Sequence, residues 1–173
     1  MSDTVPLFRL QDAWRECERN VYYLCGALTT LAPILPMTGE KFEHLTDPQV
    51  QALDQFILRF TKLQDAMGSR LFPAILQYLQ EQYEERPMLD KLNRLEKLGY
   101  IQSAEAWQSI RNTRNKFPHD YPDDGERNAA LINLAREATA IMHNMLSGVE
   151  KKLKANQPDF ALGKSLSVIC PKF

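Results

Sequence analysis

Hydrophobic side chains recur near the start of the chain at alternating intervals of four and three residues, the spacing of one face of a helix. Over residues 7–32 the repeating positions are Leu10, Trp14, Cys17, Val21, Leu24, Leu28 and Leu31. The pattern predicts one long helix. Pro33 and Pro36, followed by Gly39, end this helix and begin a loop.

A second helix is predicted to start at the sequence TDPQ. Thr46 or Asp47 would cap it, and Pro48 fits in the first turn because the N–H group that proline lacks would have no helical partner there. Its hydrophobic stripe comprises Leu53, Ile57, Phe60, Met67 and Leu71. Gln64 interrupts the stripe and would need a partner if it were buried. Pro73, in the sequence GSRLFP, should kink or divide the helix and leave helix on both sides.

Three more helical segments are predicted in the second half of the chain. MLDKLNRLEKLGY forms a short helix that Gly99 ends, with Leu89, Leu92, Leu95 and Leu98 as its apolar side. The next helix has Ser103 as its cap, and Pro118 prevents its smooth continuation. The last helix spans about 124–156, with an inward stripe of Leu131, Leu134, Ala138, Ile141, Met145 and Val149.

These patterns place the protein in the all-α class, since no segment alternates as a strand would. We expect an antiparallel bundle of four to five helices, formed by one domain over residues 1–173. The helical core covers about 7–156, and a tail follows over 157–173. A length of 173 residues and a hydrophobic fraction of 44% are sufficient for one domain with its own core.

The overall charge limits what the protein can bind. Lys and Arg total 21 and Asp and Glu total 22, which excludes the broad positive field of a protein that coats nucleic acid non-specifically. Any recognition of phosphate must therefore be local.

The cysteines and the hydrophobic segments predict a cytoplasmic protein. The cysteines, Cys17, Cys25 and Cys170, are odd in number, widely spaced and without a CxxC pair, which argues against a disulfide framework and favours a reducing compartment. The first residues do not resemble a secretory signal, and no stretch approaches the roughly 18 apolar residues of a membrane span. We expect no membrane association.

One short segment, RNTRNKFPHDYP at residues 111–122, carries the candidate chemistry. No acidic residue occurs between Glu105 and Asp120, so the cations of this segment have no neutralising partner nearby in the sequence. An arginine holds phosphate oxygens with its planar fork, and a histidine exchanges protons near neutral pH. Arg114 and His119 together would therefore suit cleavage of RNA, whose own 2′-hydroxyl is the nucleophile, without a metal.

The same residues also have a plainer interpretation. Arg114 could pair with Glu105 or with an acidic residue of 120–126, and His119 could simply fill a corner at the helix end. A single histidine cannot conveniently act as base and acid in one step, so a homodimer that brings two Arg114/His119 pairs into one cleft would complete the chemistry.

RNKFPHDY, residues 114–121, resembles the Arg-x4-His-x-Tyr motif of HEPN-domain proteins, specifically HepT-like toxins paired with minimal nucleotidyltransferase antitoxins. RFTKLQDAMGSRLFP and LDKLNRLEKLGYIQSAEAW also resemble segments of that family, and the likeness runs from the second predicted helix to the last. Asn115 matches the usual polar residue after the arginine. Pro118 departs from the commoner motif, in which a small or aliphatic residue often precedes the histidine.

The resemblance implies a dimeric HEPN bundle that acts as a metal-independent endoribonuclease. In that family pattern Arg114 and His119 are catalytic, and Asn115 supports them by hydrogen bonding. Tyr121 corresponds to the tyrosine to which the partner nucleotidyltransferase adds AMP. Each added AMP brings negative charge and bulk to the cationic site and would block it.

Other residues could extend or modify this site. Arg111 and Lys116 could continue a phosphate track on RNA, or they could be solvated helix charges. Asp65 could hydrogen-bond the motif from across the bundle, or it could be an ordinary exposed carboxylate. We expect no metal and no cofactor, because the histidines lack ligand spacing and no Gly-rich phosphate loop occurs.

Two further functions remain open at this point. The same bundle could serve as a non-catalytic, nucleotide-binding partner subunit of a minimal nucleotidyltransferase. The apolar stripes could instead belong to a purely structural helical adaptor.

Overall fold

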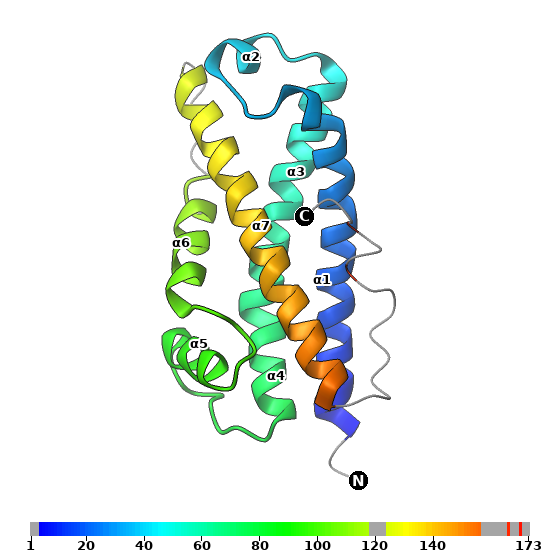
Figure 1. Cartoon of the computed structure of the whole chain (residues 1–173), viewed down its shortest axis with the longest axis vertical. Coiled ribbons are helices and arrows are strands. Elements are labelled where there is room, and N and C mark those ends of the chain that lie inside the picture. The colour runs from blue at the N-terminus through cyan, green and yellow to red at the C-terminus, as the bar shows by residue number, and fades with distance from the viewer. Residues whose placement is uncertain (1–3, 118–123, 157–165, 167–169, 171–173) are drawn as a thin grey trace.

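The computed structural model describes residues 4–117, 124–156, 166 and 170. The described residues are all-helical apart from turns and connections, and no strand occurs among them. In Figure 1, α1 (Thr4–Leu31) runs from the lower to the upper end, α3 (Asp47–Ala66) returns, α6 (Ala104–Arg114) rises and α7 (Gly125–Asn156) descends. The prediction of an all-α, antiparallel helical bundle is confirmed.

α1 forms as predicted from its apolar stripe. Its buried residues are Leu10, Ala13, Trp14, Cys17, Asn20, Val21, Leu24, Cys25, Ala27 and Leu31. The helix packs mainly against α3. Pro33 then occupies the first turn of a short 3₁₀ helix, η1 (Ala32–Ile34), where the missing N–H group of proline is tolerated.

A short helix lies where the sequence suggested only a loop. This element, α2 (Gly39–Glu43), is capped by the Thr38 hydroxyl, which accepts from the Lys41 N–H. The preceding connection is fixed from a distance, because the Asn133 amide of α7 accepts from the Met37 N–H at 2.8 Å and donates to the Met37 carbonyl at 2.9 Å. These long-range bonds hold α2 across the upper end of the bundle.

The predicted start of α3 is confirmed in detail. Thr46 is the cap, its hydroxyl accepts from the Gln49 N–H, and the Gln49 side chain accepts in return from the Thr46 N–H at 2.9 Å. This reciprocal arrangement is a capping box. Pro48 lies in the first turn, as expected.

The predicted division of the second helix is also found, and its form is a π-helical turn. η2 (Met67–Leu71) separates α3 from α4 (Phe72–Tyr78), and Pro73 lies in the first turn of α4. A widened turn accommodates a proline that cannot donate to the preceding turn. Helix therefore continues on both sides of the π-helical turn, as α3 before it and α4 after it.

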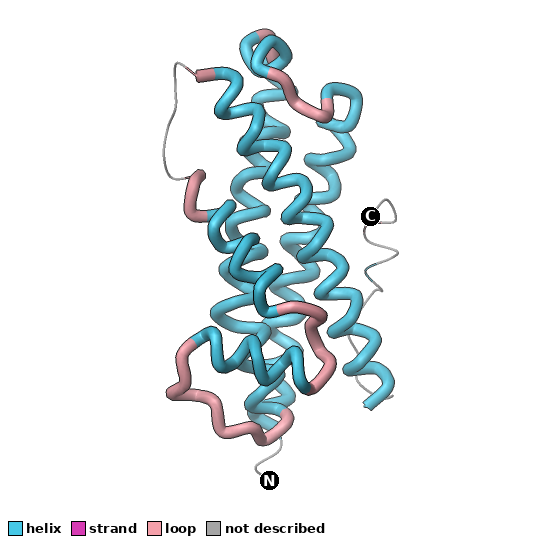
Figure 2. The backbone as a smooth tube through the Cα atoms, turned by 60° about the vertical axis from the view of Figure 1, so that its left-hand side comes forward, coloured by secondary structure: helices cyan, strands magenta, loops and turns pink. Residues whose placement is uncertain are grey.

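α5 (Met88–Lys97) lies across the lower end of the bundle (Figure 2). It ends as predicted at Gly99, whose φ of 78° is in the left-handed region that favours glycine. Leu89 was expected on its apolar side but is 57% exposed, whereas Leu92 and Leu95 are buried. The next helix, α6, begins at the predicted cap Ser103, which accepts from the Ala106 N–H at 3.1 Å.

The predicted inward stripe of α7 is partly wrong. Leu134 and Ile141 are 40% and 38% exposed. The buried side of the helix is instead broader than one stripe and includes Ala129, Leu131, Ile132, Ala135, Ala138, Met142, Met145, Leu146, Val149 and Leu153. A four-three rhythm cannot select one stripe when apolar residues occupy more than one side of a helix.

The argument against disulfide bonding is wrong for one pair of cysteines, because Cys25 and Cys170 form a disulfide. It joins the last two turns of α1 to a residue near the end of the given sequence, and both Cys170 and the nearby Leu166 are buried. Cys17 keeps a free thiol inside the core, where burial raises its pKa, so it is no candidate nucleophile. Among the described helices, none is both long and apolar enough to cross a bilayer.

Candidate active site

The predicted site begins at the C-terminal end of α6. Arg114 is the last residue of the helix and Asn115 is its C-cap, with Lys116 following in the turn. Basic residues in the last turn, here Arg111 and Arg114, interact favourably with the partial negative charge of a helix C-terminus. The fold thus presents these cations at one end of one helix.

The chain leaving α6 is anchored to the core by Phe117. Its ring packs edge-on against Phe60 of α3, with the ring centroids 5.6 Å apart. Pro118, His119 and Tyr121 lie outside the described residues. The predicted convergence of Arg114 and His119 therefore stays a prediction.

Arg114 is held by Asp65 of α3 in a two-point ion pair. Its Nε donates to one carboxylate oxygen at 3.1 Å and its Nη2 donates to the other at 2.9 Å. This hydrogen bonding raises the pKa of Arg114, and the negative charge of Asp65 adds to the effect. Of the partners that the sequence left open, the structure selects Asp65, which the sequence offered as a possible hydrogen-bonding partner from across the bundle.

Both side chains of this pair reach solvent. The Arg114 side chain is 26% exposed and the Asp65 side chain is 50% exposed. The two-point pair fixes the plane of the guanidinium, while the group remains open to an anion from outside. An incoming phosphate would find Arg114 oriented but partly neutralised.

A hollow of about 280 Å³ lies beside the pair, between η2 and the end of α6. It is lined by Gln64, Asp65, Gly68, Ser69, Met88, Trp107, Arg111, Arg114 and Asn115. Arg111 and Asn115, both predicted site residues, thus share a surface with Arg114. Lys116 is exposed but does not line the hollow. Gln64, which the sequence marked as needing an explanation, is buried and borders this space.

The floor of the hollow depends on a close approach between helices. A methyl group added at Gly68 would lie 3.0 Å from the Trp107 ring, tighter than ordinary contact. Trp107 is buried and packs edge-on against Phe72, with the centroids 4.8 Å apart. Gly68 in the π-helical turn therefore lets α6 come close enough for Arg114 to reach Asp65. The sequence analysis missed this role, although Gly68 in the quoted GSRLFP is a visible signal of it.

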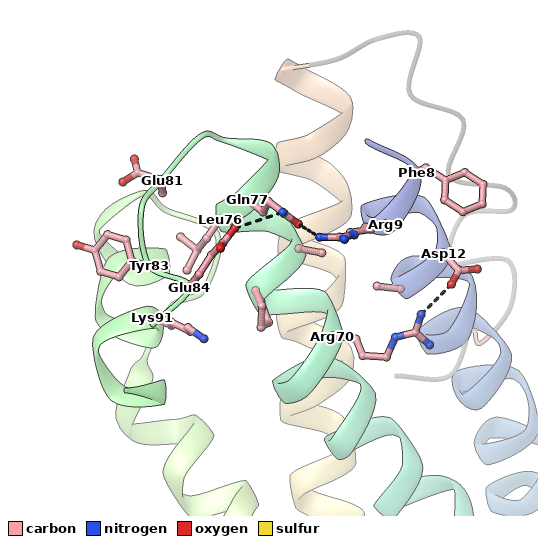
Figure 3. A pocket seen from close by; sticks show the side chains of 13 residues that line it. Phe8, Arg9, Asp12, Arg70, Leu76, Gln77, Glu81, Tyr83, Glu84 and Lys91 are labelled. Atoms are coloured by element: carbon pink, nitrogen blue, oxygen red, sulfur yellow. Dashed lines mark hydrogen bonds and ion pairs between the residues drawn. The ribbon is translucent and has the colours of Figure 1, made fainter. Parts of the chain in front are cut away.

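A second hollow, of about 460 Å³, lies between the first turns of α1, α4 and the α4–α5 connection (Figure 3). Several of its polar side chains bind one another. Arg9 donates to Gln77 at 3.2 Å and Gln77 donates to Glu84 at 3.3 Å. Arg70 binds Asp12 at 2.7 Å. Because these groups pair internally, we assign the hollow no chemistry.

The described residues include no group of three or more His, Cys, Asp or Glu side chains placed to hold a metal ion. His143 is buried on α7, where burial lowers its pKa. It lies on another helix from the Arg114 site and takes no part in it.

Comparison with known proteins found no matching family model, no matching curated protein and no matching solved structure.

Proposed function

We propose that the protein is a metal-independent endoribonuclease of the HEPN type, a HepT-like toxin, which cleaves RNA at a site built on Arg114 and His119. The observation that carries the proposal is the position of Arg114. Its guanidinium lies at the surface, is oriented by Asp65 and borders a hollow, and the chain continues directly from it toward His119. An oriented guanidinium is well suited to stabilise the negative charge of a phosphodiester transition state.

In the proposed reaction the RNA 2′-oxygen attacks the adjacent phosphorus. The bond from the 2′-oxygen to phosphorus forms while the bond to the 5′-oxygen breaks, which leaves a 2′,3′-cyclic phosphate and a free 5′-hydroxyl. His119 removes the 2′-hydroxyl proton or protonates the leaving 5′-oxygen. Arg114 stabilises the additional negative charge on the phosphate oxygens, and Asp65 holds its planar fork in register.

The proposal requires a second proton-transferring group, and a homodimer would supply it. Two copies that face each other would place two Arg114/His119 pairs in one cleft, so that one histidine acts as base and the other as acid. Asn115, which borders the hollow, would bind the substrate phosphate or support His119 by hydrogen bonding. Tyr121 would accept AMP from a nucleotidyltransferase antitoxin, and the added phosphate would neutralise the site.

The test is cleavage of RNA by the purified protein in EDTA. We expect cleavage by the wild type and loss of cleavage in His119→Ala and in Arg114→Lys, because lysine lacks the planar two-point geometry. Lys151→Ala is the matched control, since Lys151 is an exposed cation on α7. Absence of cleavage by the wild type, or undiminished cleavage by His119→Ala, would reject the mechanism.

The closed pair of Arg114 with Asp65 also supports a second candidate, a non-catalytic partner subunit that binds nucleotides for a minimal nucleotidyltransferase. A guanidinium that is paired with a carboxylate can still bind a phosphate group through its remaining N–H donors, but it stabilises the added negative charge of a transition state less strongly. This candidate predicts nucleotide binding that weakens in Arg114→Ala while RNA stays intact.

A further inference from the structure

An exposed aromatic pair lies on α1, which packs side by side with α3 (Figure 1). Tyr22 and Tyr23 of α1 are 60% and 40% exposed. Their ring centroids are 5.2 Å apart and the ring planes are nearly perpendicular, at 85°. An exposed tyrosine ring of this kind offers a π face to a flat ligand.

Two arginines converge on the ring of Tyr23. The Arg59 guanidinium of α3 lies 4.4 Å from the ring centroid, and that of Arg19 lies 5.7 Å from it. Arg59 also donates to the Asn20 side chain at 3.1 Å. The Tyr23 ring and a neutral amide therefore hold Arg59 in place.

No described carboxylate forms an ion pair with the cations of this face. Arg19, Arg59 and Lys62 make no ion pair with any carboxylate in the described part of the chain. The cations that do so are Arg70, Arg94, Arg114 and Lys154. In a chain whose formal net charge is −1, a local group of cations outside these ion pairs, beside exposed tyrosines, favours an anionic, aromatic ligand.

This face is continuous with the Arg114 site through α3. Arg59, Lys62 and Asp65 are three residues apart in turn, so each is a neighbour of the next on the helix surface. The row winds around α3 from Arg59, which contacts α1, to Asp65, which contacts α6. The row is about 9 Å long at the helical rise of 1.5 Å per residue. Its last member, Asp65, holds Arg114. A strand bound at Arg114 would meet Lys62 next and the tyrosines beyond it.

We propose that this face is a binding track for single-stranded RNA, an inference that rests on the proposed function of the Arg114 site. The phosphates of the strand lie along Lys62, Arg59 and Arg19, and a base stacks on Tyr22. Stacking on Tyr22 does not depend on which base is present, because every base has a π face, and the cations contact only the RNA backbone. The track therefore adds affinity without base specificity.

The charges of the face favour RNA over a second copy of this chain. A two-fold interface centred on the face would bring Arg19, Arg59 and Lys62 against the same residues of the other copy. Like charges in direct opposition disfavour such contact. Phosphates along the strand would instead neutralise each cation in turn.

The test measures binding of fluorescently labelled 2′-O-methyl RNA, which has no free nucleophile, by anisotropy at several salt concentrations. Loss of one stacked base in Tyr22→Ala should weaken binding about tenfold. Lys62→Glu should weaken binding and lower the slope of log K against log salt by about one. The matched controls are Phe8→Ala, since Phe8 is 62% exposed at the rim in Figure 3, and Lys151→Glu. Both controls should bind as the wild type does.

Equal affinity of Tyr22→Ala, Lys62→Glu and the controls would overturn the track, as would a change of oligomeric state in Tyr22→Ala without a change in RNA affinity. Cleavage of unmodified RNA is measured in parallel with the same variants. Cleavage without any effect of Tyr22 or Lys62 would reject the track and leave the nuclease in place. Binding that depends on both residues without cleavage would support the track and reject the nuclease.

Discussion

The disulfide between Cys25 and Cys170 allows a prediction of stability with a magnitude. The cysteines are 145 residues apart in the sequence, so the bond closes most of the chain into one loop. The loop-entropy relation gives a stabilisation of about 5 kcal/mol at 25 °C for a loop of that size, as an upper limit. Since typical domains have a free energy of unfolding of about 5–15 kcal/mol, loss of the bond should remove a large share of the stability.

The perturbation is Cys170→Ala, compared with the wild type in urea denaturation with and without a phosphine reductant. We expect the variant to unfold at a lower urea concentration than the wild type. The reductant should shift the unfolding midpoint of the wild type toward that of the variant and should leave the midpoint of the variant unchanged. Alkylation under denaturing, non-reducing conditions should modify one thiol of the wild type, that of Cys17. Three alkylated thiols, or a midpoint that Cys170→Ala does not change, would refute the reasoning.

The remaining predictions concern the helix contact, the ion pair and a buried histidine. Gly68→Ala should lower the free energy of unfolding by about 1–3 kcal/mol in urea, because the new methyl group meets Trp107 at 3.0 Å; an unchanged midpoint would contradict this contact. Asp65→Asn should lower the free energy of unfolding by about 1 kcal/mol or less, because the ion pair of Asp65 with Arg114 is partly exposed. The same variant should lower RNA cleavage more than tenfold, because Arg114 loses the group that orients it. A large loss of stability with full cleavage would instead mean that Asp65 has a structural role and does not position Arg114 for catalysis. Burial lowers the pKa of His143, so as pH falls below about 6.5 this histidine takes up a proton more readily in the unfolded chain than in the folded one. The free energy of unfolding should therefore decline with falling pH, by at most about 1.4 kcal/mol per pH unit. Thermal melts between pH 7.5 and 5.5 should show a shallower decline in His143→Gln than in the wild type.

The local signals in the sequence predicted the helices well. Proline, glycine and capping residues act over a few positions, so the starts at Thr46 and Ser103 and the end at Gly99 were readable from the chain alone. Pro73 marked the division of the second helix, although a proline signal does not say whether the result is a kink or a π-helical turn.

The features that the sequence did not predict depend on contacts between distant residues. α2 is held by Asn133, which lies almost a hundred residues away, and the disulfide joins positions 145 residues apart. The exposure of Leu134 and Ile141 reflects which part of a broadly apolar helix meets its neighbours. Contacts between distant parts of the bundle determine these features, and such contacts produce no periodic pattern of hydrophobic residues in the sequence.

The candidate site was predictable only in part, because its cations follow from local signals and the partner of Arg114 does not. The cluster of Arg111, Arg114 and Asn115 at a helix end followed from the positions of Ser103 and Pro118. The partner of Arg114 did not follow, because acidic residues near in sequence competed with Asp65 on another helix. The structure decides for Asp65 because the close packing of α3, η2 and α6 brings it within hydrogen-bonding distance.

The most direct test of the central claim uses an RNA oligonucleotide with a single 2′-deoxy substitution at the cleaved nucleotide. The account predicts cleavage of the unmodified RNA in EDTA, with a 2′,3′-cyclic phosphate on the product, and no cleavage at the substituted position. Cutting of the 2′-deoxy strand at the same position, or undiminished cutting of the unmodified strand by Arg114→Lys, would contradict a nuclease in which an oriented guanidinium assists attack by the 2′-hydroxyl of the RNA.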